Sequence, residues 1–62
     1  MEMMNEYNIT AQVINKDSFD KQTILFNDCV ESKNIKEAAE IFNKQYKDIY
    51  NILKIYSITQ VN

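Results

Sequence analysis

The side chains that could carry out nucleophilic or metal chemistry are few in this sequence. Cys29 is its one cysteine, and the chain contains no histidine. A cysteine nucleophile is normally activated by a neighbouring base, most often histidine, so a Cys–His catalytic pair is excluded. The usual zinc sites are excluded as well, because they are built from several cysteines and histidines. We therefore expect Cys29 to be a buried structural thiol.

Two pairs of acidic residues have a spacing that paired-carboxylate catalysis or a cation site could use. Asp17 and Asp20 lie in a polar stretch typical of a turn, whereas Glu37 and Glu40 lie where a helix is predicted. Helix capping and the helix dipole account for Glu37, and an i,i+4 pair with Lys44 accounts for Glu40. We therefore predict that the protein is not an enzyme and that it holds neither a metal ion nor a cofactor.

Composition narrows the class of protein further. The 62 residues carry a net charge of −2 and include no glycine and no proline, and every basic residue is lysine. Without glycine there is no glycine-rich phosphate loop, and an acidic chain without arginine is poorly suited to nucleic acid. No apolar run approaches the roughly 20 residues of a membrane span, and the N-terminus lacks a secretory signal pattern. We expect a single cytoplasmic domain over residues 1–62, with no membrane contact.

The clearest structural pattern covers residues 34–46 and predicts an amphipathic helix. Asn34, followed three residues later by Glu37, matches the capping-box pattern at a helix N-terminus. The apolar residues recur at helical spacing and would share one face: Ile35, Ala38, Ala39, Phe42 and Tyr46. The rest of the chain must supply the surface on which this face packs.

Three other stretches predict strands. Residues 7–13 alternate strictly between apolar and polar, and residues 22–26 form a short apolar run that would pair with them as a hairpin. Residues 52–61 are predicted as the third strand, while strand and helix both remain open for residues 47–56. Residues 1–6 are expected to be a frayed lead-in. The prediction is a small α+β domain of β-β-α-β order, with a three-stranded sheet and one helix on one face.

The third strand has apolar residues on both of its expected faces. Strict alternation would place Leu53, Ile55 and Val61 on one side and Ile52, Tyr56 and Ile58 on the other. One helix covers one face of a sheet, so part of this strand would stay exposed. A chain this short is also marginally stable alone. We therefore predict a protein partner and a homodimer formed through the open sheet face or an edge strand, with Tyr50, Tyr56 and Ile58 as partner-binding residues.

The β-β-α-β interpretation resembles small accessory proteins of phages and mobile elements of low-GC bacteria. The matching residues are the early strand at residues 6–9, the helix start at residues 37–39 and the C-terminal Ile55 and Ile58. The resemblance implies a compact factor that binds and modulates or inhibits a host or defence protein. A third possible function is a sponge for a small nucleotide signal, with its site built across a dimer interface.

An alternative, mostly α interpretation competes for the same segment. Residues 35–54 resemble the helix-turn-helix of resolvases and homeodomain-like regulators. Ala39 matches the small packing residue of that motif, Asn43 its turn, and Ile49 and Ile52 its second-helix core. The resemblance implies a DNA-binding transcriptional regulator with groove-facing residues Gln45, Lys47, Tyr50, Asn51 and Lys54.

Overall fold

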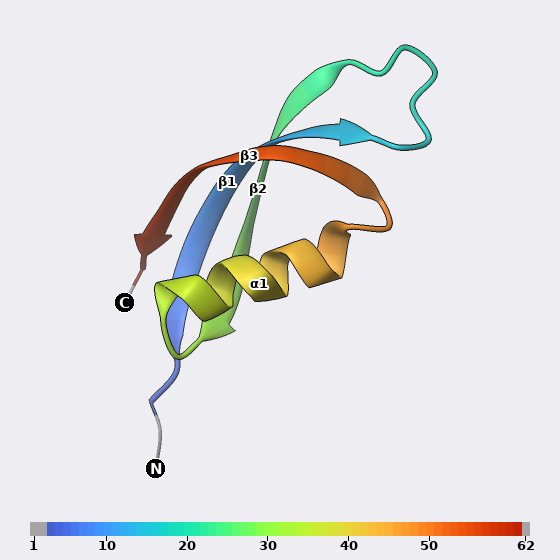
Figure 1. Ribbon diagram of the computed structural model, residues 1–62. Helices are drawn as coiled ribbons and strands as arrows, with labels where there is room; N and C mark the ends of the chain where they lie inside the picture. The colour runs from blue at the N-terminus through green and yellow to red at the C-terminus, as the bar shows by residue number, and fades with distance from the viewer. Residues whose placement is uncertain (1–2, 62) are drawn as a thin grey trace.

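The chain folds as a three-stranded antiparallel sheet with one helix packed on one face (Figure 1). The computed structural model describes residues 3–61. Strand β1 covers Asn5–Asn15, β2 covers Thr23–Ser32, helix α1 covers Ile35–Tyr46 and β3 covers Tyr50–Gln60. The strand order across the sheet is β2-β1-β3, with β1 in the centre. This architecture confirms the predicted α+β class and its β-β-α-β order.

Strand β1 supplies most of the core because its alternating residues face α1. Tyr7, Ile9, Ala11 and Val13 are buried, the last three of them completely, whereas the polar residues between them are only half-buried. The strand is longer than predicted and begins at Asn5, which pairs with Ser32 of β2. The frayed lead-in is therefore wrong for residues 5 and 6, and residues 1 and 2 lie outside the described residues.

Strand β2 pairs with β1 without a register shift, from Asn5 opposite Ser32 to Ile14 opposite Thr23. It is twice as long as predicted, because its polar residues continue the alternation beyond the apolar run. Even-numbered residues of β2 oppose the buried residues of β1, so Val30 and Ser32 are buried. Cys29 is odd-numbered and exposed. The prediction of a buried thiol was wrong because the cysteine lies on the open face of the sheet.

Helix α1 begins and ends as the sequence predicts. The side chain of Asn34 accepts a hydrogen bond from the backbone N–H of Glu37 at 2.8 Å, which confirms the N-cap. Ala38 and Phe42 are completely buried against the sheet. Ile35, expected on the packed face, is exposed instead, because it is the first helical residue and lies at the end of the contact with the sheet.

Strand β3 departs from the simple alternation at two β-bulges. Its pairing with β1 shifts register between Thr10 and Ala11 and again between Gln12 and Val13. The shifts leave Tyr56 and Leu53 without partners on β1. As a result Ile52, Ile55 and Ile58 oppose the buried residues of β1 and pack against the core.

Strand β3 corrects two sequence predictions. The expected two faces of the third strand were wrong, since Ile52, Ile55 and Ile58 share the helix side while Leu53, Tyr56 and Val61 are exposed. The helix-turn-helix interpretation was wrong as well. Lys47 caps α1, and the chain then turns into a strand at Tyr50 rather than into a second helix.

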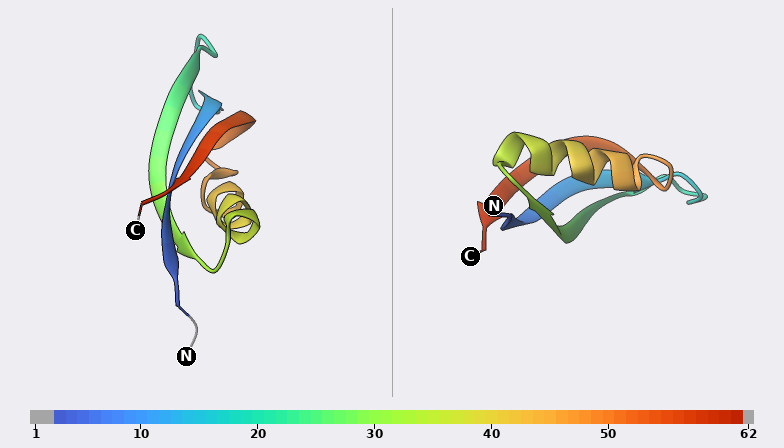
Figure 2. Two further views of the ribbon diagram at one scale, coloured as in Figure 1. Left: turned by 90° about the vertical axis from the view of Figure 1, so that its left-hand side faces the viewer. Right: turned by 90° about the horizontal axis from the view of Figure 1, so that it is seen from below.

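The domain is elongated, with extents of 46 × 18 × 13 Å. The turn between β1 and β2 projects past the C-terminal end of α1 and the start of β3 (Figures 1 and 2). Figure 2 also shows the helix confined to one side of a strongly twisted sheet. Within residues 3–61, no helix has the length and apolar character needed to cross a lipid bilayer.

Candidate functional site

The most distinctive surface is the projecting turn between β1 and β2, which we call the hairpin tip (residues 16–22). The chain has no glycine, so this turn is formed by other residues and is held by hydrogen bonds of the turn and its flanks. The Asn15 carbonyl accepts a hydrogen bond from the N–H of Ser18 at 3.0 Å, and the Asn15 side chain accepts one from the N–H of Asp17 at 2.9 Å. Lys21 adopts a left-handed backbone with φ of 56°, a conformation that glycine would take without strain.

Asp20 organises the other half of the hairpin tip. Its carboxylate accepts hydrogen bonds from the Ser18 hydroxyl at 2.7 Å and from the N–H of Gln22 at 3.3 Å. These two donors lower the pKa of Asp20, the Ser18 hydroxyl more strongly, because they favour the charged carboxylate. Lys21 adds a bond from its ammonium to the carbonyl of Lys16 at 2.7 Å. The tip is therefore a hydrogen-bonded structure rather than a loose loop.

Phe19 lies at this tip with its side chain fully exposed to solvent. Phenylalanine is among the residues most often buried in folded proteins, so a fully exposed ring on a hydrogen-bonded turn is unusual. Charged residues surround it in the sequence, among them Asp17 and Asp20. In the sequence, Phe19 is the one apolar residue of the polar stretch 15–20. Its position at the far end of the molecule could not be predicted from that.

The base of the hairpin tip is fixed to the rest of the domain. The Lys16 N–H bonds the carbonyl of Ile49 at 3.0 Å, and the Lys16 ammonium bonds the carbonyl of Lys47 at 2.5 Å. The backbone of Lys16 is thus tied to the segment between α1 and β3. The base of the tip is therefore held at two points by the segment between α1 and β3.

A cluster of four aromatic rings supports this base from the helix side. It consists of Phe26, Phe42, Tyr46 and Tyr50, with neighbouring ring centroids 4.8–6.1 Å apart. Tyr46 donates its phenolic hydrogen bond to the carboxylate of Asp28 on β2. This bond, followed by burial and the charge of Asp28, raises the pKa of Tyr46 to about 12. The cluster joins β2, α1 and β3, and its Tyr50 pairs with Asn15 at the base of the hairpin tip.

The three residues predicted to bind a partner do not form one surface. Tyr50 belongs to the aromatic cluster, and Ile58 opposes Ile9 and packs against the core. Tyr56 is exposed at its bulge, where the Lys54 ammonium lies 5.2 Å from the centroid of its ring. Of the three side chains, only that of Tyr56 is exposed, whereas those of Tyr50 and Ile58 are partly buried.

The residues predicted to face a DNA groove lie on different elements. Gln45 is in the last turn of α1, Lys47 is its C-cap, and Tyr50, Asn51 and Lys54 are on β3. Tyr50 faces the aromatic cluster, whereas Lys54 opposes Gln12 on the open side of the sheet. They cannot enter a major groove together on one helix.

The open face of the sheet is polar along its centre. Thr10 lies between Asn27 on β2 and Ser57 on β3, and Asn8 lies between Cys29 and Thr59. The amide of Asn27 donates hydrogen bonds to the side chains of Asn8 and Thr10, the latter at 2.9 Å. The side chains of Asn8, Thr10 and Asn27 therefore satisfy one another at the centre of this face.

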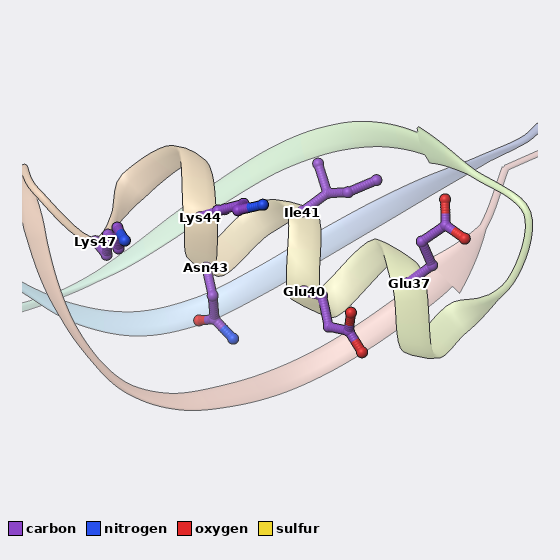
Figure 3. Close-up of a pocket in the computed structure, with 6 residues that line it drawn as sticks. All are labelled: Glu37, Glu40, Ile41, Asn43, Lys44 and Lys47. Carbon is purple, nitrogen blue, oxygen red and sulfur yellow. The ribbon is translucent and has the colours of Figure 1, made fainter.

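A hollow lies on the outer surface of α1 (Figure 3). Its lining comes from one helix and its C-cap: Glu37, Glu40, Ile41, Asn43, Lys44 and Lys47. In Figure 3 these side chains fan out to both sides of the helix and do not converge on one point. Residues 3–61 contain no group of three or more potential metal ligands. The hollow therefore offers no built ligand site.

Comparison with known proteins gives no relative. No protein-family model, no curated protein and no solved structure matches this chain.

Proposed function

We propose that this protein is a small non-catalytic binding module that inserts Phe19 into an apolar pocket of a partner protein and thereby modulates the partner. The observation that supports the proposal most directly is the full exposure of Phe19 at the end of a hydrogen-bonded, anchored hairpin. Aromatic anchors that enter a pocket dominate the energy of many protein interfaces. The pre-ordered turn reduces the entropy that is lost when the ring is immobilised on binding.

The surroundings of Phe19 fit such an interaction. The tip projects beyond α1 and β3, so a pocket can receive the ring without clashing with the body of the domain. Asp17 and Asp20 lie on either side of Phe19 in the sequence, and Lys16 and Lys21 add two positive charges to the hairpin tip. A pocket whose rim carries groups of both signs would therefore complement this tip.

The identity of the partner is part of the same proposal. The resemblance of residues 6–9, residues 37–39, Ile55 and Ile58 to phage and mobile-element accessory proteins supports a host or defence protein as the target. Modulation or inhibition of that target would take place in the cytoplasm of the host cell. The charge of −2 and the absence of arginine favour a protein partner over nucleic acid.

The proposal is tested by comparing captured proteins across matched variants. Tagged protein is used as bait in a lysate of the native host, with nuclease added, and bound proteins are quantified by mass spectrometry. Phe19→Ala should abolish capture of one partner. Met3→Ala, which also removes an exposed apolar side chain, should retain it. Equal capture by wild type and Phe19→Ala would overturn the proposal, as would recovery of DNA with wild type when nuclease is left out.

A further inference from the structure

We propose that two copies of this chain pair through their β2 edges, antiparallel and about a two-fold axis at Asn27, to form one continuous six-stranded sheet. This edge is separate from Phe19, and the pairing does not depend on the proposed function. The strand order β2-β1-β3 leaves one side of β2 and one side of β3 without a neighbouring strand. These two edges differ in character.

The β3 edge is protected against pairing, and the β2 edge is not. Two bulges, at Leu53 and Tyr56, interrupt β3, and such bulges are a common means of preventing edge-to-edge association. Strand β2 runs from Thr23 to Ser32 with a regular register, and it contains neither proline nor lysine. It therefore presents an uninterrupted row of backbone donors and acceptors that another strand can use.

The open sheet face is a poorer candidate for self-association. Its centre consists of polar side chains, and the amide of Asn27 is already bonded to Asn8 and Thr10. The apolar residues left exposed on β2 are instead Ile24 and Leu25, with exposed fractions of 44% and 67%. Pairing along the β2 edge would cover part of both Ile24 and Leu25. Packing two polar sheet centres face to face would leave these side chains exposed.

Geometry limits the possible registers of a β2–β2 pair. Directly opposed residues in an antiparallel pair lie on the same face of the sheet. A two-fold axis perpendicular to the sheet also keeps both helices on one face, so helix-facing residues must oppose helix-facing residues. The two longest registers that satisfy this condition are centred on Asn27 and on Asp28.

The charges on β2 decide between these two registers. Centring on Asp28 would bring two Asp28 carboxylates directly opposite each other, which is unfavourable. Centring on Asn27 moves these carboxylates to diagonal positions and places Phe26 opposite Asp28. The same register places Ile24 opposite Val30 and Leu25 opposite Cys29. The exposed apolar residues of one copy thus meet apolar or weakly polar residues of the second copy on both faces.

Cys29 provides a direct test, because it is the only cysteine and is exposed. In the proposed register it faces Leu25 of the second copy, so Leu25→Cys should form interchain disulfides with Cys29 when the protein is oxidised with diamide. Thr23→Cys is the matched control, since Thr23 is also exposed on the same face of β2 but would oppose Glu31. Wild type and Thr23→Cys should remain without covalent dimer.

Sedimentation of the reduced protein completes the test. Wild type should sediment with twice the mass of one chain at concentrations of tens of micromolar, and circular dichroism should show that both cysteine variants keep the wild-type fold. A monomeric mass would overturn the proposal. So would a dimer in which Leu25→Cys fails to cross-link, or in which Thr23→Cys cross-links instead. Phe19→Ala should leave the dimer mass unchanged, which separates this proposal from the proposed function.

Discussion

Tyr46 in the last turn of α1 donates a hydrogen bond to the carboxylate of Asp28 on β2. This bond is a polar link between the helix and the sheet within an otherwise aromatic cluster. The two residues are 18 positions apart in the chain, and the sequence does not predict their interaction. Its effect on the pKa of Tyr46 makes it measurable in solution.

We predict that Asp28→Asn lowers the pKa of Tyr46 from about 12 toward the ordinary tyrosine value of 10.0, because the hydrogen bond to the carboxylate is weakened and the negative charge that disfavours the phenolate is removed. The pKa is measured by ultraviolet titration of wild type and variant, with Tyr46→Phe used to identify the signal of this residue. An unchanged titration in Asp28→Asn would show that the bond to Asp28 does not set the pKa.

The same pKa predicts how stability depends on alkaline pH. A tyrosine whose pKa is raised on folding contributes stability that is fully present below the unfolded pKa and is lost as pH rises through the folded pKa. The free energy of unfolding should therefore fall between about pH 10 and pH 12. Tyr46→Phe should make this fall shallower in urea unfolding experiments. An equally steep fall in that variant would assign the effect to other groups.

Phe42→Ala should unfold the protein or nearly so. Phe42 is the completely buried member of the aromatic cluster, and truncation of a buried phenylalanine costs about 3–5 kcal/mol. Small domains have total stabilities of only about 5 kcal/mol or a little more, so little would remain. Phe19→Ala removes the same side chain from a fully exposed position and should change the urea midpoint very little. Similar losses in both variants would contradict the assignment of the core.

Ile58→Lys and Tyr56→Lys should differ in their effect on folding. Ile58 packs against the core opposite Ile9, so a lysine there should lower the melting temperature strongly. Tyr56 is exposed at a bulge, so Tyr56→Lys should retain a melting temperature close to that of wild type. Thermal unfolding followed by circular dichroism distinguishes the two variants. If the two substitutions lowered the melting temperature equally, Tyr56 would not be at an exposed bulge.

Asn34→Ala should destabilise the domain by about 1 kcal/mol, because the first helical N–H groups lose the side-chain acceptor. Asn34→Asp keeps an acceptor at the same position and should restore most of that stability. Urea unfolding curves of the two variants measure the difference. If the aspartate variant were as unstable as the alanine variant, the loss would have a cause other than capping.

The sequence predicted those elements whose pattern is local. The alternation of residues 7–13 identified the central strand, and Asn34 with Glu37 identified the start of the helix. Both signals reflect interactions between residues close together in the chain. They were sufficient to predict the order of the elements and the class of the fold.

The faces of β3 and the exposure of Cys29 required information that is not local. Register shifts on β3 arise from its pairing with β1, and nothing in residues 50–60 alone marks Leu53 and Tyr56 as the unpaired positions. Cys29 faces solvent because β2 continues in strict alternation beyond the predicted apolar run. The candidate binding residue Phe19 was missed as a site for a related reason, since its exposure depends on how far the hairpin extends past the helix.

The bulges of β3 have a consequence for the order in which the chain folds. They give its core residues Ile52, Ile55 and Ile58 a spacing of three, which is close to the period of a helix, so the local pattern of this segment does not by itself specify a strand. Pairing with β1 must supply that information. We therefore expect the β1–β2 hairpin and α1 to form first, and β3 to be the last strand to dock onto a partly formed sheet.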